Sequence, residues 1–159
     1  MHKVRLAQLE DWPNVAKLWE NYQKSTEKPG IEGDLGAVKA LFLGGLTAPQ
    51  VGFLVIEGAQ DPADLVGFGV VTEALATMPV NGTVQFVRHG FVRAILIRPK
   101  TSIRAALGLA QAIEDWGKLR GYPFLRGDCT EQYMQHAETV YTRLGWKKSH
   151  IVVCKNLEV

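Results

Sequence analysis

A chain of 159 residues, 47% hydrophobic and 21% charged, is typical of one globular domain with a substantial core, and this excludes a disordered or fibrous protein. The formal net charge of +2 argues against nucleic acid as a partner. No run approaches the roughly 20 apolar residues that span a bilayer, and the N-terminus lacks a signal-peptide pattern, so we expect a soluble, cytoplasmic protein.

The N-terminal half predicts a short strand, two helices and a β-hairpin. A strand begins near Val4, and acidic residues with Pro13 in the first turn then start a helix. Asp34 is placed to cap a second helix, which Gly44-Gly45 frays or ends. Residues 51–57 and 65–72 predict an antiparallel hairpin, and the Asn81-Gly82 turn indicates that it extends as an arm or flap.

The C-terminal half predicts strands that alternate with helices. We expect a strand at 94–99, a loop at 100–106, a helix at 107–120, a strand at 124–129, a helix at 131–144 closed by Gly145, and a last strand near 151–153. The whole order is β-α-α-β-β-β-α-β-α-β. It predicts a single domain over residues 1–159, of the α/β (α+β) class, with a mixed, mainly antiparallel sheet covered by helices on both faces.

The segment after the strand at 94–99 has the features of an anion site. A strand that ends at Pro99 and feeds a helix places unpartnered amides and the positive end of the helix dipole together. Lys100 and Arg104 add charge, so this segment suits a small polyanion. Metal ligation is not expected, because Cys129 and Cys154 lack CxxC spacing and no other His/Cys/Asp/Glu pattern fits a site.

The element order and two motifs resemble the GNAT superfamily of acyl-CoA-dependent N-acetyltransferases. Ile97-Arg98-Pro99 is similar to the Val-x-Pro that ends the central strand of that family. The more specific motif is Ala137-x-x-x-Tyr141-x-x-x-Gly145-Trp146, which is similar to the family's Ala-x-x-x-Tyr-x-x-x-Gly-Phe. The resemblance covers essentially the whole chain.

That resemblance implies acetyl-CoA as the acyl donor. In the family, the central strand splays from its neighbour and its main chain pairs with the pantetheine, here at Ile95 and Ile97. The following loop would hold the pyrophosphate over its amides. The cofactor-binding residues expected there are Lys100, Ser102, Ile103, Arg104, Ala105 and Ala106.

The loop departs from the family pattern. Thr101, Ser102, Arg104 and Ala106 occupy the places of the family's Arg, Gly, Gly and Gly. Glycine permits both a close approach of the main chain to phosphate and positive φ values. Ser102 could instead cap the helix, and Arg104 could supply a charged fork.

Direct acyl transfer needs a group that protonates the leaving thiolate and a group that takes a proton from the amine. The resemblance places Tyr141 beside the thioester sulfur as the acid. Asp128 and Glu73 are the candidate bases, with His89 as another. Each of these also has an ordinary structural reading, as a packed aromatic or a solvated loop residue.

The leading hypothesis is an N-acetyltransferase that acts on a primary amine of a small molecule or peptide. The alternative is a non-catalytic GNAT-fold binding or assembly protein that has lost the cofactor loop. Acyl transfer from a different donor is a more distant option. The β-rich segment at 83–87 leaves a homodimer open as well.

Overall fold

The computed structural model describes residues 2–24, 34–127, 142–143 and 145–146. The predicted helix at 131–144, apart from its end, and the predicted strand near 151–153 lie outside these residues. Among the described residues, one sheet contains strands that are neighbours in chain order: β1 (Val4–Leu6), β2 (Val51–Glu57), β3 (Leu65–Val80), β4 (Thr83–Ile97) and β5 (Leu125–Gly127).

The sheet is mixed and mainly antiparallel, as predicted. β1, β2, β3 and β4 pair antiparallel in succession, and β4 pairs in parallel with β5. A parallel pair needs a crossover connection, which helix α3 (Ile103–Leu119) provides. The chain therefore changes from a meander to a crossover after β4.

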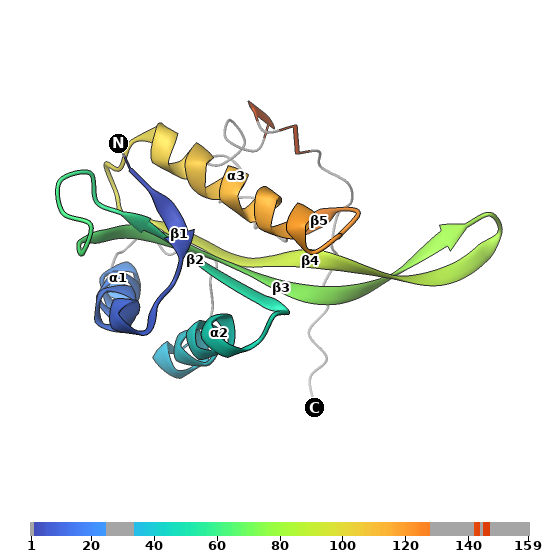
Figure 1. Ribbon diagram of the computed structural model, residues 1–159, viewed down its shortest axis with the longest axis horizontal. Helices are drawn as coiled ribbons and strands as arrows, with labels where there is room; N and C mark the ends of the chain where they lie inside the picture. The colour runs from blue at the N-terminus through green and yellow to red at the C-terminus, as the bar shows by residue number, and fades with distance from the viewer. Residues whose placement is uncertain (1, 25–33, 128–141, 144, 147–159) are drawn as a thin grey trace.

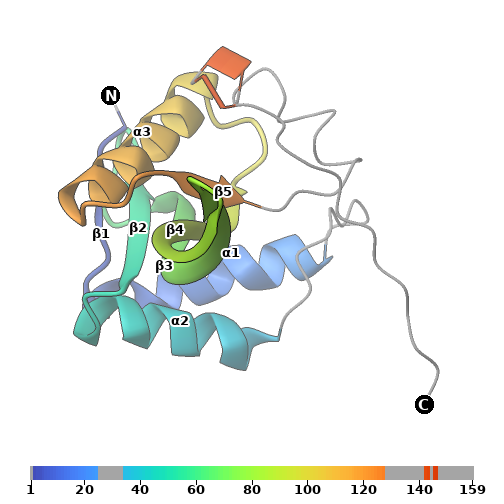
Figure 2. The same ribbon diagram turned by 90° about the vertical axis from the view of Figure 1, so that its right-hand side faces the viewer.

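Helices cover both faces of the sheet, which confirms the predicted layers. Helices α1 (Trp12–Lys24) and α2 (Leu35–Thr47) lie on one face, and α3 lies on the other (Figure 2). Each interface has its own apolar core. Val15, Trp19, Phe42, Phe53 and Phe68 belong to the first, and Leu54, Ile56, Leu109, Ile113 and Trp116 to the second.

The hairpin of β3 and β4 extends well beyond the helices as an arm (Figure 1). The two strands stay paired as far as Val80 and Thr83, and Asn81 and Gly82 form the turn between them with φ of 51° and 79°. Positive φ at both central positions is typical of the type I′ turn, which Asn-Gly favours. The predicted arm is therefore confirmed, but it is formed by β3 with β4, and the strand expected at 94–99 begins at Thr83 and ends at Ile97.

Two helix boundaries differ from those that the sequence predicts. α3 begins at Ile103 rather than near residue 107, because the Ser102 side chain accepts a hydrogen bond from the Ala105 amide and caps the helix there. α2 continues through Gly44 and Gly45 to Thr47. Gly45 lies against β2, where an added Cβ would come within 2.5 Å of the Phe53 Cβ, so this glycine permits close helix–sheet packing and does not end the helix.

The N-terminal turn is also different. Glu10 and Asp11 belong to a 3-10 turn, η1 (Leu9–Asp11), before α1 begins at Trp12. Arg5 of β1 donates to both carboxylate oxygens of Asp11, at 2.7 and 2.9 Å, and to Glu57 of β2 at 2.6 Å. None of the described helices is long and apolar enough to cross a membrane.

We expect Gly45→Ala to destabilise the chain by about 1–3 kcal/mol, because the new methyl group would overpack against Phe53. Gly108→Ala is the matched control, since an added Cβ there meets only Val4 Cγ2 at 3.7 Å. Replacing a glycine inside a helix in open space stabilises by about 0.5–1 kcal/mol. Urea denaturation of both variants measures the difference, and equal stability of the two would contradict the packing argument.

Candidate functional site

The end of β4 turns part of its main chain away from β3. The register between the strands shifts at Val70 and Val71, which leaves Arg93 as an extra residue between Val92 and Ala94. Beyond this bulge, the Arg98 amide donates to the Val66 carbonyl of β3 at 2.8 Å. Because strand residues alternate, the main-chain groups of Ile95 and Ile97 point to the opposite edge, toward the side on which β5 lies.

At this edge the described pairing with β5 is short. β5 pairs with Gly90, Phe91 and Val92 only, whereas β4 continues to Ile97. The outward groups of Ile97 make no hydrogen bond to another described residue, whereas Ile95 does have a further interaction. A divergence of the two strands beyond Val92 is thus consistent with the described residues, and pantetheine pairing at Ile95 and Ile97 stays a prediction.

A tight turn connects β4 to α3. The Thr101 amide donates to the Arg98 carbonyl at 3.2 Å, with Pro99 and Lys100 between them. Lys100 has φ of 65°, the left-handed conformation that the third residue of a type II turn requires. In this turn, position 100 is therefore the one whose backbone conformation favours glycine, and lysine occupies it.

The start of α3 presents two unsatisfied amides. Ser102 is exposed and its side chain and carbonyl both accept from the Ala105 amide, at 3.4 and 2.9 Å. The amides of Ile103 and Arg104 donate to no described residue. Ala105 is buried and Ala106 is half-buried. Of the residues after Ser102 that are expected to contact the anion through their amides, Ile103 and Arg104 are therefore the two that remain exposed with a free amide among the described residues.

The absence of glycine has a limited effect on this backbone. Ser102 has φ of −63° and residues from Ile103 onward are helical, so none of the family's glycine positions from 102 to 106 needs a positive φ here. The remaining role of glycine is to let a ligand approach the main chain closely. Exposed side chains at Ser102 and Arg104 restrict that approach, and Arg104 adds a cation in exchange.

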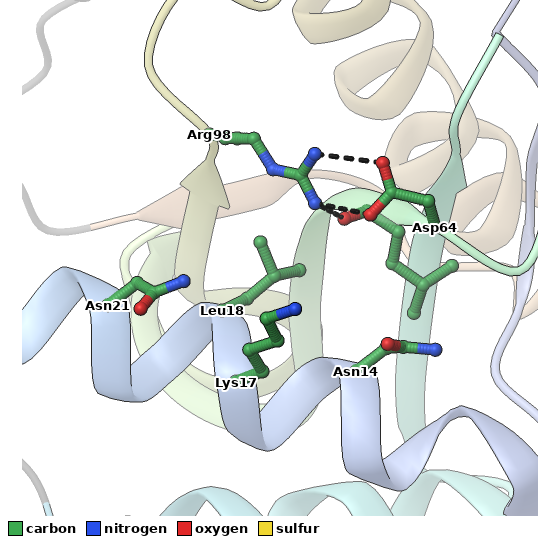
Figure 3. Close-up of a pocket in the computed structure, with 7 residues that line it drawn as sticks. Asn14, Lys17, Leu18, Asn21, Asp64 and Arg98 are labelled. Atoms are coloured by element: carbon green, nitrogen blue, oxygen red, sulfur yellow. Dashed lines mark hydrogen bonds and ion pairs between the residues drawn. The ribbon is translucent and has the colours of Figure 1, made fainter. Parts of the chain in front are cut away.

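Of the cationic side chains near the turn, Arg98 is held in an ion pair. Its guanidinium donates to both carboxylate oxygens of Asp64, at 2.9 and 2.7 Å, and to the Leu65 carbonyl at 2.7 Å (Figure 3). The hydrogen bonds from Arg98 hold the pKa of Asp64 below its usual range. Lys100 and Arg104 are exposed, and neither forms an ion pair with a described residue.

The Arg98–Asp64 pair borders a small cavity on the α1 side of the sheet (Figure 3). Its volume is about 170 Å³, and its lining is mostly polar: Asn14, Lys17, Leu18, Asn21, Asp64, Leu65 and Arg98. Pockets that enclose a nucleotide-sized ligand are typically about 300–1,000 Å³. This cavity is therefore too small for a coenzyme, and its ion pair joins the β2–β3 loop to the end of β4.

Glu73, a candidate base, lies at the root of the arm. Its Oε2 accepts a hydrogen bond from the Tyr122 hydroxyl at 3.0 Å and lies 4.0 Å from Arg88. Burial, and then the bond to the Glu73 carboxylate, raises the pKa of Tyr122. No local pattern predicts this contact, because 49 residues separate the two partners and Tyr122 lies in a segment that indicates only the end of a helix.

His89 occupies the opposite side of the sheet from Glu73. It pairs with Ala74, the next position along from the Glu73–Gly90 pair, so the alternation of side chains places it on the other face. Its side chain is 2% exposed, it stacks on Phe124 at a centroid distance of 4.8 Å, and neither ring nitrogen has a hydrogen-bond partner among the described residues. A buried imidazole without such partners is unusual in folded proteins.

Asp128 and Tyr141 lie outside the described residues, so their roles stay predictions. The end of the predicted last helix is partly described. Thr142 and Arg143 are helical and Gly145 has φ of 75°, as the predicted glycine cap requires. The Trp146 indole donates to Glu114 of α3 at 2.7 Å, which attaches the end of this motif to α3. No three metal-ligating side chains gather among the described residues.

No protein-family model and no curated protein sequence matches this chain. Solved structures do match it. The aminoglycoside acetyltransferase AAC(6')-Iy, in complex with the bisubstrate analogue CoA-S-monomethyl-acetylneamine, superposes with a TM-score of 0.73 at 17% identity, over 100% of this chain and 99% of that one. The chain has the GNAT acetyltransferase fold.

Other structures with the GNAT fold match over similar lengths. The aminoglycoside 6'-N-acetyltransferase AAC(6')-Ih from Acinetobacter baumannii has a TM-score of 0.70 at 17% identity, covering 100% of this chain and 99% of its own. Glucosamine-6-phosphate N-acetyltransferase from Arabidopsis thaliana has a TM-score of 0.69 at 12% identity, covering 99% of each chain. At these identities the GNAT fold is shared while most side chains differ.

We expect Tyr122→Phe to lower the free energy of unfolding at neutral pH by about 1 kcal/mol, because the variant loses the hydrogen bond to Glu73. The pKa of Tyr122 is raised in the folded chain, so its contribution is present below the ordinary tyrosine pKa of about 10 and disappears as the pH rises through the folded value. Urea denaturation at neutral and strongly alkaline pH measures both effects. With Glu73→Gln as the background, the Tyr122 substitution should cost less; an unchanged cost would show that the pair is not coupled.

Proposed function

We propose that this chain is an N-acetyltransferase that transfers the acetyl group of acetyl-CoA to a primary amine of a small molecule. The observation that carries the proposal is the match to the GNAT fold over the whole chain, with a relative that holds a CoA bisubstrate analogue. The neighbours named above act, by their names, on aminoglycosides and glucosamine-6-phosphate. Both are amino sugars, which supports a small amine as the acceptor.

In this proposal the start of α3 binds the pyrophosphate of acetyl-CoA. The free amides of Ile103 and Arg104 lie at the positive end of the helix dipole, where anions are stabilised. The side chains of Lys100 and Arg104 are exposed beside these amides and supply positive charge. Ala105 and Ala106 keep the first turn small next to the ligand.

The pantetheine would extend along the edge of β4. The outward main-chain groups of Ile97 and Ile95 are at the right edge to pair with its amides, as a further strand would. The thioester would then lie near Val92, where the described pairing between β4 and β5 ends. This arrangement fixes the acyl carbon before the amine approaches, and positioning of that kind supplies much of the rate of a direct transfer.

The transfer itself needs no covalent enzyme intermediate. The neutral amine attacks the thioester carbonyl, the C–N bond forms, and the C–S bond breaks to release the CoA thiolate. Tyr141 is proposed to give its proton to that thiolate. Glu73 and Asp128 are the proposed acceptors of the amine's proton, and His89 is a further candidate.

The competing proposal is a non-catalytic GNAT-fold binding protein. It is favoured by one observation, the side chains that stand at the family's glycine positions, with Arg104 exposed among them. The two proposals differ in whether acetyl-CoA binds and in whether Tyr141 affects turnover.

We expect acetyl-CoA to raise the melting temperature of the chain. At a ligand concentration a hundredfold above Kd the stabilisation is about 2.7 kcal/mol, which corresponds to about 5–10 °C for a chain of this size. Arg104→Gln should reduce the shift. Lys118→Gln should leave it unchanged, because Lys118 lies at the far end of α3, where its ammonium pairs with Asp115 at 3.8 Å. Absence of any shift at millimolar acetyl-CoA would favour the non-catalytic proposal.

Tyr141→Phe should lower kcat at least tenfold and leave the affinity for CoA nearly unchanged, because only the proton donor is removed. Steady-state kinetics with amino-sugar acceptors and CoA titration measure the two quantities separately. Tyr22→Phe on α1 serves as the control tyrosine. Full activity of the Tyr141 variant would remove the acid role from this residue.

A further inference from the structure

The arm of the β3–β4 hairpin exposes apolar side chains on one of its faces. Beyond the root at Glu73, side chains at odd positions of β3 and even positions of β4 share the face on which α3 lies, because Glu73 itself contacts Tyr122. On this face Leu75 is 66% exposed, Val84 72% and Phe86 76%. A two-stranded hairpin by itself is only marginally stable in water, so an arm of this kind gains from additional pairing.

The turn determines which main-chain groups face outward. In a two-residue hairpin the flanking residues, here Val80 and Thr83, exchange hydrogen bonds, and the pairs then alternate along the strands. The amides and carbonyls of Val84, Phe86 and Arg88 therefore point away from β3. The Gly90 amide, next in the same series, confirms this direction because it donates to the Phe124 carbonyl before β5 at 3.3 Å.

The two edges of the arm are protected unequally. On the β3 edge the Glu73 amide already donates to the Gln50 carbonyl at 2.8 Å, and Pro79 stands at an outward position where it has no amide hydrogen to offer. The β4 edge from Val84 to Arg88 contains no proline and no bulge, and Arg88 is its only charged residue. Natural edge strands are usually blocked by such devices, and their absence indicates an edge that pairs.

We propose that this β4 edge pairs with the same edge of a second copy of the chain. The two strands run antiparallel about a two-fold axis at Phe86, so that Phe86 of one copy lies opposite Phe86 of the other and Val84 lies opposite Arg88. Each outward residue then exchanges both of its main-chain hydrogen bonds across the interface. The result is a four-stranded sheet of two arms, with Leu75, Val84 and Phe86 of both copies gathered on one face.

Three features select a second copy as the occupant. An antiparallel edge is complementary to itself, so identical strands satisfy a two-fold contact without further adaptation. The two Arg88 side chains are kept about 13 Å apart along the strands in this register, since four residues separate Val84 from Arg88. The pairing between the copies also ends where β5 begins to pair with β4, at Gly90 and Leu125, so the register uses all of the arm's β4 edge that no other described strand pairs with.

The first test is the solution mass of three proteins, measured by light scattering and sedimentation equilibrium. The wild type should have twice the chain mass of 17.6 kDa. Phe86→Pro removes an outward amide and should be a monomer. Thr77→Pro is the matched control. Thr77 lies directly across the hairpin from Phe86, and the two residues do not exchange hydrogen bonds with each other. The proline therefore removes an outward amide from the β3 edge, and this variant should remain a dimer. A monomeric wild type, or dimeric Phe86→Pro, overturns the proposal.

A second test does not depend on tolerance of proline. In the proposed register the two Phe86 Cα atoms are about 5.5 Å apart, within the span of about 4.4–6.8 Å that a disulfide bridges. Phe86→Cys should therefore form a covalent dimer under mild oxidation, while Thr77→Cys and the wild type, with its own cysteines, should not. Failure of Phe86→Cys to cross-link, or equal cross-linking of Thr77→Cys, would overturn this register. Neither test depends on acetyl-CoA binding or turnover.

Discussion

The long antiparallel pairing of β3 with β4 is the constraint on which the rest of this structure depends. The strands remain in register from Gly67 and Ile97 to Val80 and Thr83, with one shift at Val70 and Val71. That shift reverses which residues of β4 turn their main-chain groups away from β3, so these residues are even-numbered in the arm and odd-numbered near the end of β4. A single bulge thus places Ile95 and Ile97 at the proposed coenzyme edge.

The position of α3 follows from small residues in the strands beneath it. An added Cβ on Gly69 would come within 2.9 Å of Ile113, and one on Gly52 within 2.7 Å of Trp116. Both glycines let the helix approach the sheet, and its buried residues fill the second core. Because α3 is held at this depth, the direction of its first turn, and hence of the Ile103 and Arg104 amides, is fixed relative to β4.

Some charged side chains form ion pairs that join parts of the fold, and others remain exposed for contact with a ligand. Arg5 is held by Asp11 and Glu57, and the hydrogen bond that it donates to Asp11, despite the opposing effect of burial, raises the pKa of Arg5 above its usual value. Burial alone would raise the pKa of Asp11, yet hydrogen bonds from Arg5 and the Gln8 amide lower it overall. Arg98 is likewise held by Asp64. These pairs join β1, β2 and the β2–β3 loop to their neighbours, and they leave Lys100 and Arg104 as the cations at the proposed phosphate site.

The sequence by itself determined the order of the described elements, the sheet with helices on both faces and the Asn81-Gly82 turn. These features depend on hydrophobic periodicity, turn residues and helix caps. Such signals act over a few residues, so they can be recognised in the sequence. Tertiary structure alone decided that α2 continues through Gly45, that Arg98 pairs with Asp64, that Tyr122 contacts Glu73, and that His89 is buried on Phe124. Each of these depends on residues far apart in sequence whose separation closes only when the sheet forms, and no local pattern encodes that distance.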